Sequence, residues 1–437
     1  MRLGRFFQVF PIASLVASAA LAQSTGPVFQ PGFHQALRSS MTTSMRTTYR
    51  MKLPIGRAGS RIRLAFKAGD GSLTLHSATV AVAGSQGVLL SPPRDLTFGD
   101  LPGFTTGPRS RVTSDPVSFE VAFGQELYVS FDVEGALAVS DINAFPDSYS
   151  WSGSHTRETN PPAGTPFMQA VGLDTIDVEA GATTAFVALG DSITEGYVSG
   201  DVWAYVSKND DYRGAWTTIT QGLLGLPVAN AGVNGQGVDQ AIAALGSEVF
   251  TLQGITDCIV LLGTNNLGTW TADQIEARLA ALFDQLRPFC HVWAGTLLPK
   301  ERTPNGTYSD VVSRRVAVND WIRHQAAVDG TIDFEAVLAA TGNMNLFAPG
   351  LGSDGIHPSI AGQSAMGHEA ARVLAHAPEG SDGGTIQPPP SNPSSPGSPP
   401  PSVSSPSATG CNASGVVPSL LALMPLFAFF RRRAALS

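Results

Sequence analysis

The chain has 437 residues, of which 14% are charged and 43% are hydrophobic. This composition excludes a wholly disordered chain and permits a sizeable core, and the length predicts two folded domains with appended segments. The formal net charge of −8 argues against nucleic acid as a partner.

The N-terminus has the features of a secretory signal peptide. Arg2 and Arg5 begin the chain, an apolar stretch follows over residues 6–20, and Ala20-Leu21-Ala22 offers small residues for cleavage. The apolar stretch is too short and too interrupted for a membrane-spanning helix. We therefore expect residues 1–22 to be removed and the protein to be exported.

Residues 27–181 predict an all-β sandwich domain of jelly-roll type. Short runs rich in Val, Leu, Phe and Ile alternate apolar with polar or small residues, and Gly, Pro, Asp and Ser separate these runs. The runs cover residues 61–66, 77–83, 117–123, 127–133 and 175–178. No amphipathic helical pattern interrupts them.

A basic stretch lies at the start of this β region. Between Gln23 and Gly69 there is no Asp or Glu, whereas the basic residues are Arg38, Arg46, Arg50, Lys52, Arg57, Arg61, Arg63 and Lys67. One interpretation is a solvated strand face, which we favour. The other is a patch that meets an anionic surface or polysaccharide.

From residue 184 to 378 the pattern changes to strands that alternate with helices. The strands are expected at residues 185–189, 228–231, 258–262, 292–297 and 331–334. The helices are expected at residues 215–224, 239–245, 272–286, 311–328 and 360–375. This alternation predicts a three-layer α/β domain whose parallel sheet is covered on both faces.

The C-terminal part has two segments of biased composition. Residues 379–410 are mostly Ser, Pro and Gly and predict an extended linker. Residues 411–437 contain Cys411, an apolar run over residues 416–430 and three arginines at 431–433. This order resembles bacterial surface-sorting tails of the PEP-CTERM and MYXO-CTERM kind, and a simple membrane anchor is the alternative. Both interpretations place the folded domains outside the cytoplasm, at the cell surface or attached to a membrane.

Three cysteines are few for an exported protein. Cys258 and Cys290 lie in apolar, strand-like runs, which favours buried small hydrophobic side chains over a disulfide but leaves pairing open. Neither a CxxC pair nor a cluster of histidines indicates a metal site, and we expect no cofactor.

Four polar blocks lie where strands of the α/β region end or just before its last helix. They are residues 190–196 around Ser192, residues 230–235, residues 263–266, and Asp354-Gly355-Ile356-His357-Pro358. In open α/β sheets the carboxyl ends of the strands form one edge, and ligands bind there. The four blocks are therefore expected to meet at one site.

Each block also has an ordinary structural interpretation. Gly-Asp-Ser and Asp-Gly are common in turns, Asn265 could form a turn, and Gly235 could allow close packing. Asp354 could cap the last helix, and His357 could be a surface histidine. Four such blocks in this order favour a catalytic site over these separate interpretations.

In this order the blocks resemble those of the SGNH hydrolase superfamily, which includes the GDSL esterases and lipases. The resemblance covers residues 185–374, and its sharpest feature is the Asp-x-x-His spacing of Asp354 and His357. It implies a flavodoxin-like α/β/α fold and a serine esterase in which Ser192 is the nucleophile, His357 the base and Asp354 the acid that orients it.

The same resemblance implies an oxyanion hole. Its donors would be the backbone amides of Ser192 and Gly235 and the side-chain amide of Asn265. Asn266 follows where many relatives have Asp, and its uncharged side chain can still hydrogen-bond to nearby loops.

The order of a β domain and an SGNH domain also resembles secreted bacterial esterases, some of which are similar to carbohydrate esterases that remove acetyl groups from polysaccharides. The expected substrate is therefore a small ester or an acylated polysaccharide. A lipase or lysophospholipase is the first alternative, but residues 201–213 are mostly polar and offer no apolar lid. An inactive carbohydrate-binding surface protein is the second, and the presence of Ser192, Asn265 and His357 argues against it.

Overall fold

The computed structural model describes residues 26–198 and 210–375. The predicted signal peptide, linker and C-terminal segment, with Cys411, lie outside the described residues, as does most of the polar stretch 201–213. The described residues fall within one compact unit, Met1–Pro378, so the domain boundary at 181–184 stays a prediction. Within the described part of the chain, no helix is long and apolar enough to cross a membrane.

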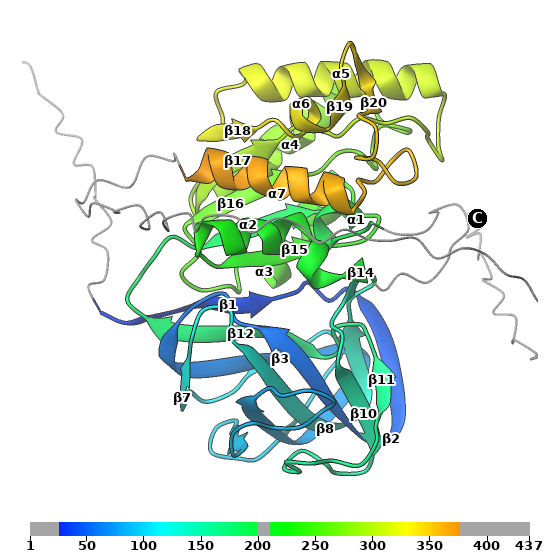
Figure 1. The fold of residues 1–437 in the computed structure, drawn as a ribbon. Helices are drawn as coiled ribbons and strands as arrows, with labels where there is room; N and C mark the ends of the chain where they lie inside the picture. Colours follow the sequence, from blue (N-terminus) through cyan, green and yellow to red (C-terminus); the bar gives the residue numbers. More distant parts are fainter. Residues whose placement is uncertain (1–25, 199–209, 376–437) are drawn as a thin grey trace, which may run out of the picture. The chain divides into compact units, whose positions relative to one another are not determined.

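The N-terminal half is largely β, as predicted, and its long strands curl around an apolar core (Figure 1). The main sheet has 11 strands, in the order β1-β12-β3-β8-β2-β10-β11, and β4, β5, β6 and β7 each pair with β3. The strands are β1 Val28–His34, β2 Ser39–Pro54, β3 Gly59–Val82, β4 Arg94–Asp95, β5 Phe104–Thr106, β6 Arg111–Thr113, β7 Val117–Val121, β8 Glu126–Val139, β9 Asn143–Ala144, β10 Ser148–Ser152, β11 Thr165–Phe167 and β12 Leu173–Ala180.

Strand β3 corrects the predicted strand pattern. It covers the predicted run 61–66 and all but the last residue of the predicted run 77–83, because it pairs first with β12 and then with β8. The register of its pairing with β8 shifts between Ala68 and Leu73, where Gly69 and Gly71 lie, and this local break produced the turn-like sequence signal. Strand β2 was not predicted, because its first half is exposed and polar.

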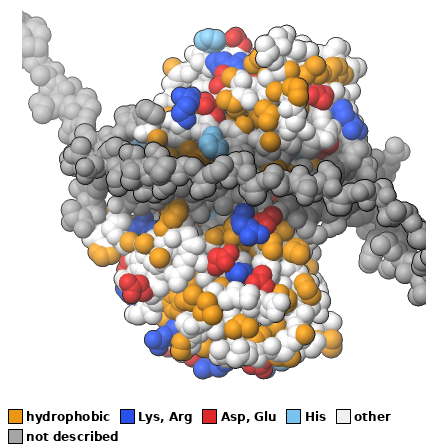
Figure 2. All heavy atoms as spheres, viewed as in Figure 1, with side chains coloured by type: hydrophobic (Ala, Val, Ile, Leu, Met, Phe, Trp, Pro, Cys, Tyr) orange, Lys and Arg blue, Asp and Glu red, His pale blue; other side chains and the backbone are white. Residues whose placement is uncertain are grey.

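The basic residues of the N-terminal stretch do not form one solvated face: Arg46 and Arg61 are exposed, whereas Lys67 is buried. Arg46, Lys52, Arg61, Arg63 and Lys67 make ion pairs with Asp132, Glu126, Glu179, Asp177 and Glu248, respectively. Arg50 and Arg57 are buried. On the face shown in Figure 2, basic and acidic side chains are interspersed. The acids were missed because they lie far along the sequence, on neighbouring elements.

The C-terminal half alternates strands and helices, and its five-stranded sheet is parallel, in the order β15-β13-β16-β17-β18. Its strands are β13 Phe186–Gly190, β14 Asp210–Asp211, β15 Val228–Gly232, β16 Asp257–Leu261, β17 His291–Gly295, β18 Gly330–Ile332, β19 Ala339–Ala340 and β20 Asn343–Phe347. Its helices are α1 Ser192–Glu195, η2 Tyr212–Gly214, α2 Trp216–Leu224, α3 Val238–Glu248, α4 Ala272–Leu286, α5 Tyr308–His324, α6 Phe334–Leu338 and α7 Ile360–Leu374.

Both faces of the parallel sheet are apolar, because its strands are buried on each side. Val187 and Leu189 of β13 belong to a cluster that includes side chains of α3, α4 and α5. Phe186 and Ala188 point the other way, into a cluster with α2, α6 and α7. The predicted last strand, 331–334, is corrected: Asp333 caps a short helix, α6, by accepting a hydrogen bond from the amide of Ala336.

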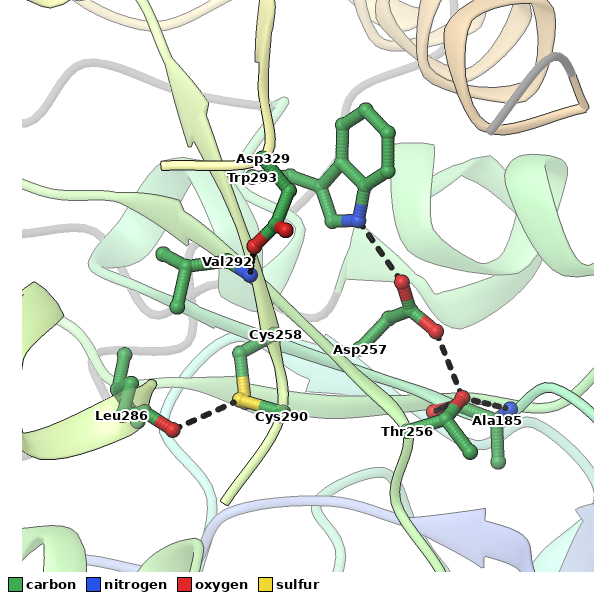
Figure 3. Close-up of a disulfide and its surroundings, with 9 residues drawn as sticks. All are labelled: Ala185, Thr256, Asp257, Cys258, Leu286, Cys290, Val292, Trp293 and Asp329. Carbon is green, nitrogen blue, oxygen red and sulfur yellow. Dashed lines mark hydrogen bonds between the residues drawn. A yellow bond between two sulfur atoms is a disulfide. The ribbon is translucent and has the colours of Figure 1, made fainter. Parts of the chain in front are cut away.

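Cys258 and Cys290 are both buried, as expected, but they form a disulfide, which corrects the favoured interpretation (Figure 3). Their Cα atoms are 5.8 Å apart although the residues are 32 positions apart in the sequence. Cys258 is in β16, and Cys290 directly precedes the neighbouring strand β17. Parallel pairing of these strands brings the two cysteines together, which the sequence pattern could not show.

Candidate active site

Ser192 is the first residue of α1, directly after the tight turn that follows β13. Asp191 caps α1 by accepting a hydrogen bond from the amide of Ile193 at 2.9 Å. Gly190 leaves no room for a side chain, because a Cβ there would collide with Thr194. The turn therefore places Ser192 at the carboxyl end of β13, where the residue is buried.

Ser192, His357 and Asp354 form a continuous hydrogen-bonded chain, although 165 residues separate Ser192 from His357. The Ser192 Oγ lies 2.8 Å from the His357 Nε2, and the His357 Nδ1 lies 2.9 Å from the Asp354 Oδ2. A carboxylate can only accept, so the Nδ1 carries the proton and the Nε2 accepts from the serine hydroxyl. The structure thus brings together the three residues that the sequence predicted.

The acid of this chain is held in its ionised form. Burial would raise the pKa of Asp354, but hydrogen bonds from His357 and Ile356 and the nearby imidazole outweigh it and hold that pKa at about 2. The second oxygen, Oδ1, accepts the backbone amides of His357 at 2.8 Å and Ile356 at 3.0 Å. Gly355, with φ +81, permits the turn that makes these contacts.

Two side chains around the histidine were not predicted. The ring of Tyr197 stacks on the imidazole of His357, with centroids 3.9 Å apart. Gln363 of α7 is fully buried and donates to the carbonyl oxygens of Ile193 and Tyr197 while accepting from the amide of Trp216. A polar residue within the apolar stripe of the last helix was the signal that could have revealed Gln363.

The loop after β15, residues 233–236, is hydrogen-bonded to the end of β13. The carbonyl oxygen of Gly190 accepts hydrogen bonds from the amide of Val233 at 3.1 Å and from the Gln236 Nε2 at 3.0 Å. Gly235 has φ +72, and no atom would lie within 4 Å of a Cβ there. A glycine is therefore needed at position 235 for its left-handed backbone conformation, and the interpretation that it allows close packing is wrong.

Asn265 reaches the same loop from the end of β16. Its Nδ2 donates to the carbonyl oxygen of Gln236 at 3.0 Å, and its side chain is exposed. The buried neighbour Asn266 accepts a hydrogen bond from the amide of Val238 at 3.1 Å, at the start of α3. The expected hydrogen bonding of the uncharged Asn266 is confirmed.

Three further buried charged groups lie at this edge of the sheet and were not predicted. Burial raises the pKa of Asp191 to about 6 and that of Glu195 to about 8. Burial also lowers the pKa of Lys300 to about 8, and its Nζ donates to the carbonyl and hydroxyl oxygens of Thr264. Such shifted groups gather at functional sites more often than elsewhere. Across residues 26–198 and 210–375, no group of three or more His, Cys, Asp and Glu side chains is arranged to hold a metal ion.

Residues 188–365 match the model of the GDSL-like lipase/acylhydrolase family. The chain therefore contains a GDSL-like lipase/acylhydrolase domain. The matched segment of this GDSL-like domain begins in β13 and ends in α7, so it includes all four polar blocks, and the family predicted from them is confirmed. The predicted sorting tail lies outside the described residues.

The GDSL-like domain also matches solved structures, whereas no curated protein matches the chain. An aryl esterase of M. smegmatis is 18% identical, with 45% of this chain and 100% of that chain covered and a TM-score of 0.38. A carbohydrate acetylesterase from Sinorhizobium meliloti is 18% identical, with 44% and 99% covered and a TM-score of 0.36. A GDSL-like lipase from Bacteroides thetaiotaomicron is 18% identical, with 44% and 89% covered and a TM-score of 0.36.

Proposed function

We propose that the protein is a serine esterase that hydrolyses carboxylic esters through an acyl-enzyme. The observation that carries this proposal is the hydrogen-bonded chain from Ser192 through His357 to Asp354, at 2.8 and 2.9 Å. A serine hydroxyl is a weak nucleophile unless a base lies within hydrogen-bond reach, and the His357 Nε2 meets that condition.

In the first half of the reaction, the Ser192 Oγ forms a bond to the ester carbonyl carbon while its proton moves to the His357 Nε2. The resulting imidazolium is stabilised by Asp354, whose pKa of about 2 keeps it ionised. The tetrahedral intermediate then collapses: the bond from the carbonyl carbon to the alcohol oxygen breaks, and the Nε2 proton passes to the leaving alcohol. In the second half, water repeats the sequence and releases the acid and free Ser192.

The oxyanion that develops on the carbonyl oxygen needs donors fixed in advance. The amides of Ser192 and Gly235 and the Asn265 Nδ2 are suited to this role. Hydrogen bonds from residues 233–236 to Gly190 and from Asn265 to Gln236 support this assignment, because they hold these donors in place. We name residues 233–236 the oxyanion loop.

The substrate we infer is a short acyl ester, such as acetyl, on a carbohydrate. The exposed residues at the oxyanion loop and beside it are Asn234, Gly235 and Asn265. Such a polar rim suits a hydroxylated alcohol group better than a lipid chain.

We infer a finer description of the scaffold as well. Apolar clusters on both faces of the parallel sheet support a three-layer, flavodoxin-like SGNH domain. The long antiparallel strands of the N-terminal half support a sandwich that is jelly-roll-like. In this scaffold Ser192, Gly235 and Asn265 all follow the carboxyl ends of neighbouring strands.

We also propose that the protein is exported and acts at the cell surface or outside the cell. The disulfide between Cys258 and Cys290 supports export, because disulfides form and persist in oxidising compartments. The signal-like residues 1–22 and the apolar C-terminal segment support it from the sequence. Cell fractionation with detection of the protein tests this proposal, and recovery in the cytoplasm alone contradicts it.

The deciding experiment measures hydrolysis of p-nitrophenyl esters of increasing acyl length by the full chain, beside Ser192→Ala. We expect activity on acetyl and other short chains that disappears in the variant. Release of acetate from an acetylated polysaccharide then tests the alcohol. A preference for long acyl chains would favour a lipase, and equal activity of the folded variant would overturn the serine mechanism.

A further inference from the structure

Glu195 is a buried acid that the proposed mechanism does not use. It is the last residue of α1, three positions after Ser192, and its side chain is 1% exposed. Its Oε1 accepts the backbone amides of Asp141 at 2.7 Å and Ile142 at 2.8 Å. Its Oε2 accepts the amide of Asn234 at 2.9 Å.

These three amides belong to two different halves of the molecule. Asp141 and Ile142 lie between β8 and β9 in the β half, whereas Asn234 lies in the oxyanion loop, directly before Gly235. One oxygen of the carboxyl group therefore bonds to the β half, and the other bonds to the loop whose next amide is a proposed oxyanion donor.

The neighbouring contacts leave little freedom at this junction. A Cβ at Gly196 would collide with Asn143 of β9, and one at Gly232 would collide with the backbone of Thr194 and Glu195. The Asn143 Nδ2 in turn donates to the Gln35 Oε1 at 2.9 Å. The turn at residues 141–142 is therefore packed tightly against the nucleophile turn, and the oxyanion loop is packed against it from the other side.

We propose that Glu195 is a positioning residue through which the β half holds the oxyanion loop in its reactive geometry. This inference rests on the esterase function proposed above. It assigns the β half a role in turnover: the turn at residues 141–142 fixes the Glu195 carboxyl group, which fixes the Asn234 amide and thereby the direction of the Gly235 amide.

Two substitutions separate this role from simple burial of an acid. In Glu195→Gln the shape is kept, but the amide nitrogen accepts no hydrogen bond, so only one of the two sides can remain bonded. In Glu195→Asp both oxygens still accept, but the side chain is one methylene shorter and cannot reach both sides. Both variants should lower kcat by about tenfold to 100-fold and leave KM within about twofold, because loss of a whole oxyanion donor costs about 10²–10³.

A boronic acid inhibitor, whose trigonal boron becomes tetrahedral when the Ser192 oxygen bonds to it, gives a readout that a structural role would not change. Its Ki should rise in Glu195→Gln by the same factor as kcat/KM falls, since both report binding in the oxyanion hole. The matched control is Glu248→Gln, which changes another buried acid between the two halves. Glu248 pairs with Lys67 at 2.5 Å and lies at the end of α3 that is farther from the oxyanion loop. This control should lose stability but keep kcat within about twofold.

The outcomes distinguish the two proposals. If wild-type protein and Ser192→Ala are equally inactive on every ester, the esterase function itself fails. If wild-type activity depends on Ser192 but folded Glu195→Gln keeps wild-type kcat and Ki, or Glu248→Gln loses as much kcat, only the role of Glu195 is overturned.

Hydrogen exchange on the wild-type chain tests the inference without any variant. Binding of the boronic acid should slow exchange at the amides of Asp141, Ile142 and Asn234 together. Unchanged exchange at Asp141 and Ile142, with protection confined to the oxyanion loop, would contradict the coupling even if neither Glu195 variant folds.

Discussion

Ionisable side chains have different kinds of partner in two regions of this molecule. At the edge of the parallel sheet, Asp191, Glu195, Lys300 and Asp354 are held mainly by backbone groups or by His357. In the β half and at its junction with α3, Arg46, Arg63, Arg111 and Lys67 each pair with an acid, namely Asp132, Asp177, Asp174 and Glu248.

This difference distinguishes groups whose protonation affects the candidate site from groups whose ion pairs stabilise the fold. At the sheet edge, burial shifts the pKa of Asp191, Glu195 and Lys300 to about 6, 8 and 8. Hydrogen bonds and the nearby imidazole instead hold the pKa of Asp354 at about 2. A buried ion pair instead fixes the register between two elements, at a desolvation cost that its attraction offsets. Substitutions in the first region should therefore change turnover, and those in the second should change stability.

The largest effect is expected at the sheet edge, in Asp354→Asn. The side-chain amide would favour the wrong imidazole tautomer, so kcat should fall by about 10⁴-fold. Steady-state kinetics on p-nitrophenyl acetate measures this, with circular dichroism to confirm folding. A loss of less than tenfold would remove Asp354 from the catalytic chain.

The next effect should appear in the second region, in Lys67→Met. The change leaves the Glu248 carboxylate buried without its partner, which should cost about 3–5 kcal/mol in the free energy of unfolding. Denaturant unfolding measures this, and kcat of the folded fraction should stay near wild type. The double variant Lys67→Met/Glu248→Leu should recover most of the stability; if it does not, packing rather than charge explains the loss.

Asn265→Ala tests whether a residue at the sheet edge can change turnover without changing stability, because Asn265 is polar and exposed. We expect kcat to fall by about 10²–10³ through loss of one oxyanion donor. The unfolding midpoint should hardly move, since the side chain is exposed. Unchanged kcat would leave Asn265 as a turn-former.

The last effect is gradual: a pH dependence of stability that depends on Glu195. Because burial raises the pKa of Glu195 from 4.5 to about 8, the native state keeps a proton that the unfolded state has lost between these values. Stability from this group is therefore fully present below pH 4.5 and is lost as the pH rises towards 8, by on the order of 1 kcal/mol per pH unit. Urea unfolding at pH 5, 6.5 and 8 should show this slope in wild type and a flatter one in Glu195→Gln.

Local patterns predicted the GDSL-like domain well, because its strands are short, apolar and followed by their functional residues. Ser192 was found in this way, whereas Asp354 and His357 were found from their Asp-x-x-His spacing just before the last helix. The residues that orient them were not: Gln363 and Glu195 act through backbone groups 170 and 54 positions away in the sequence. The β half was harder, because β3 pairs with several partners and its charges are balanced by distant acids. The disulfide likewise depends on which strands are neighbours.

The strand order of the parallel sheet gives the β half one more role. β15 is the edge strand of that sheet, and Gln35, just beyond β1, pairs with its Asn230 in a parallel bridge, with the Ala36 amide bonded to the Asn230 carbonyl oxygen at 2.9 Å. An uncovered edge strand is a template for pairing with other chains. The β half thus covers part of this edge at Asn230. We expect a fragment that begins at residue 184 to associate with itself through the uncovered strand.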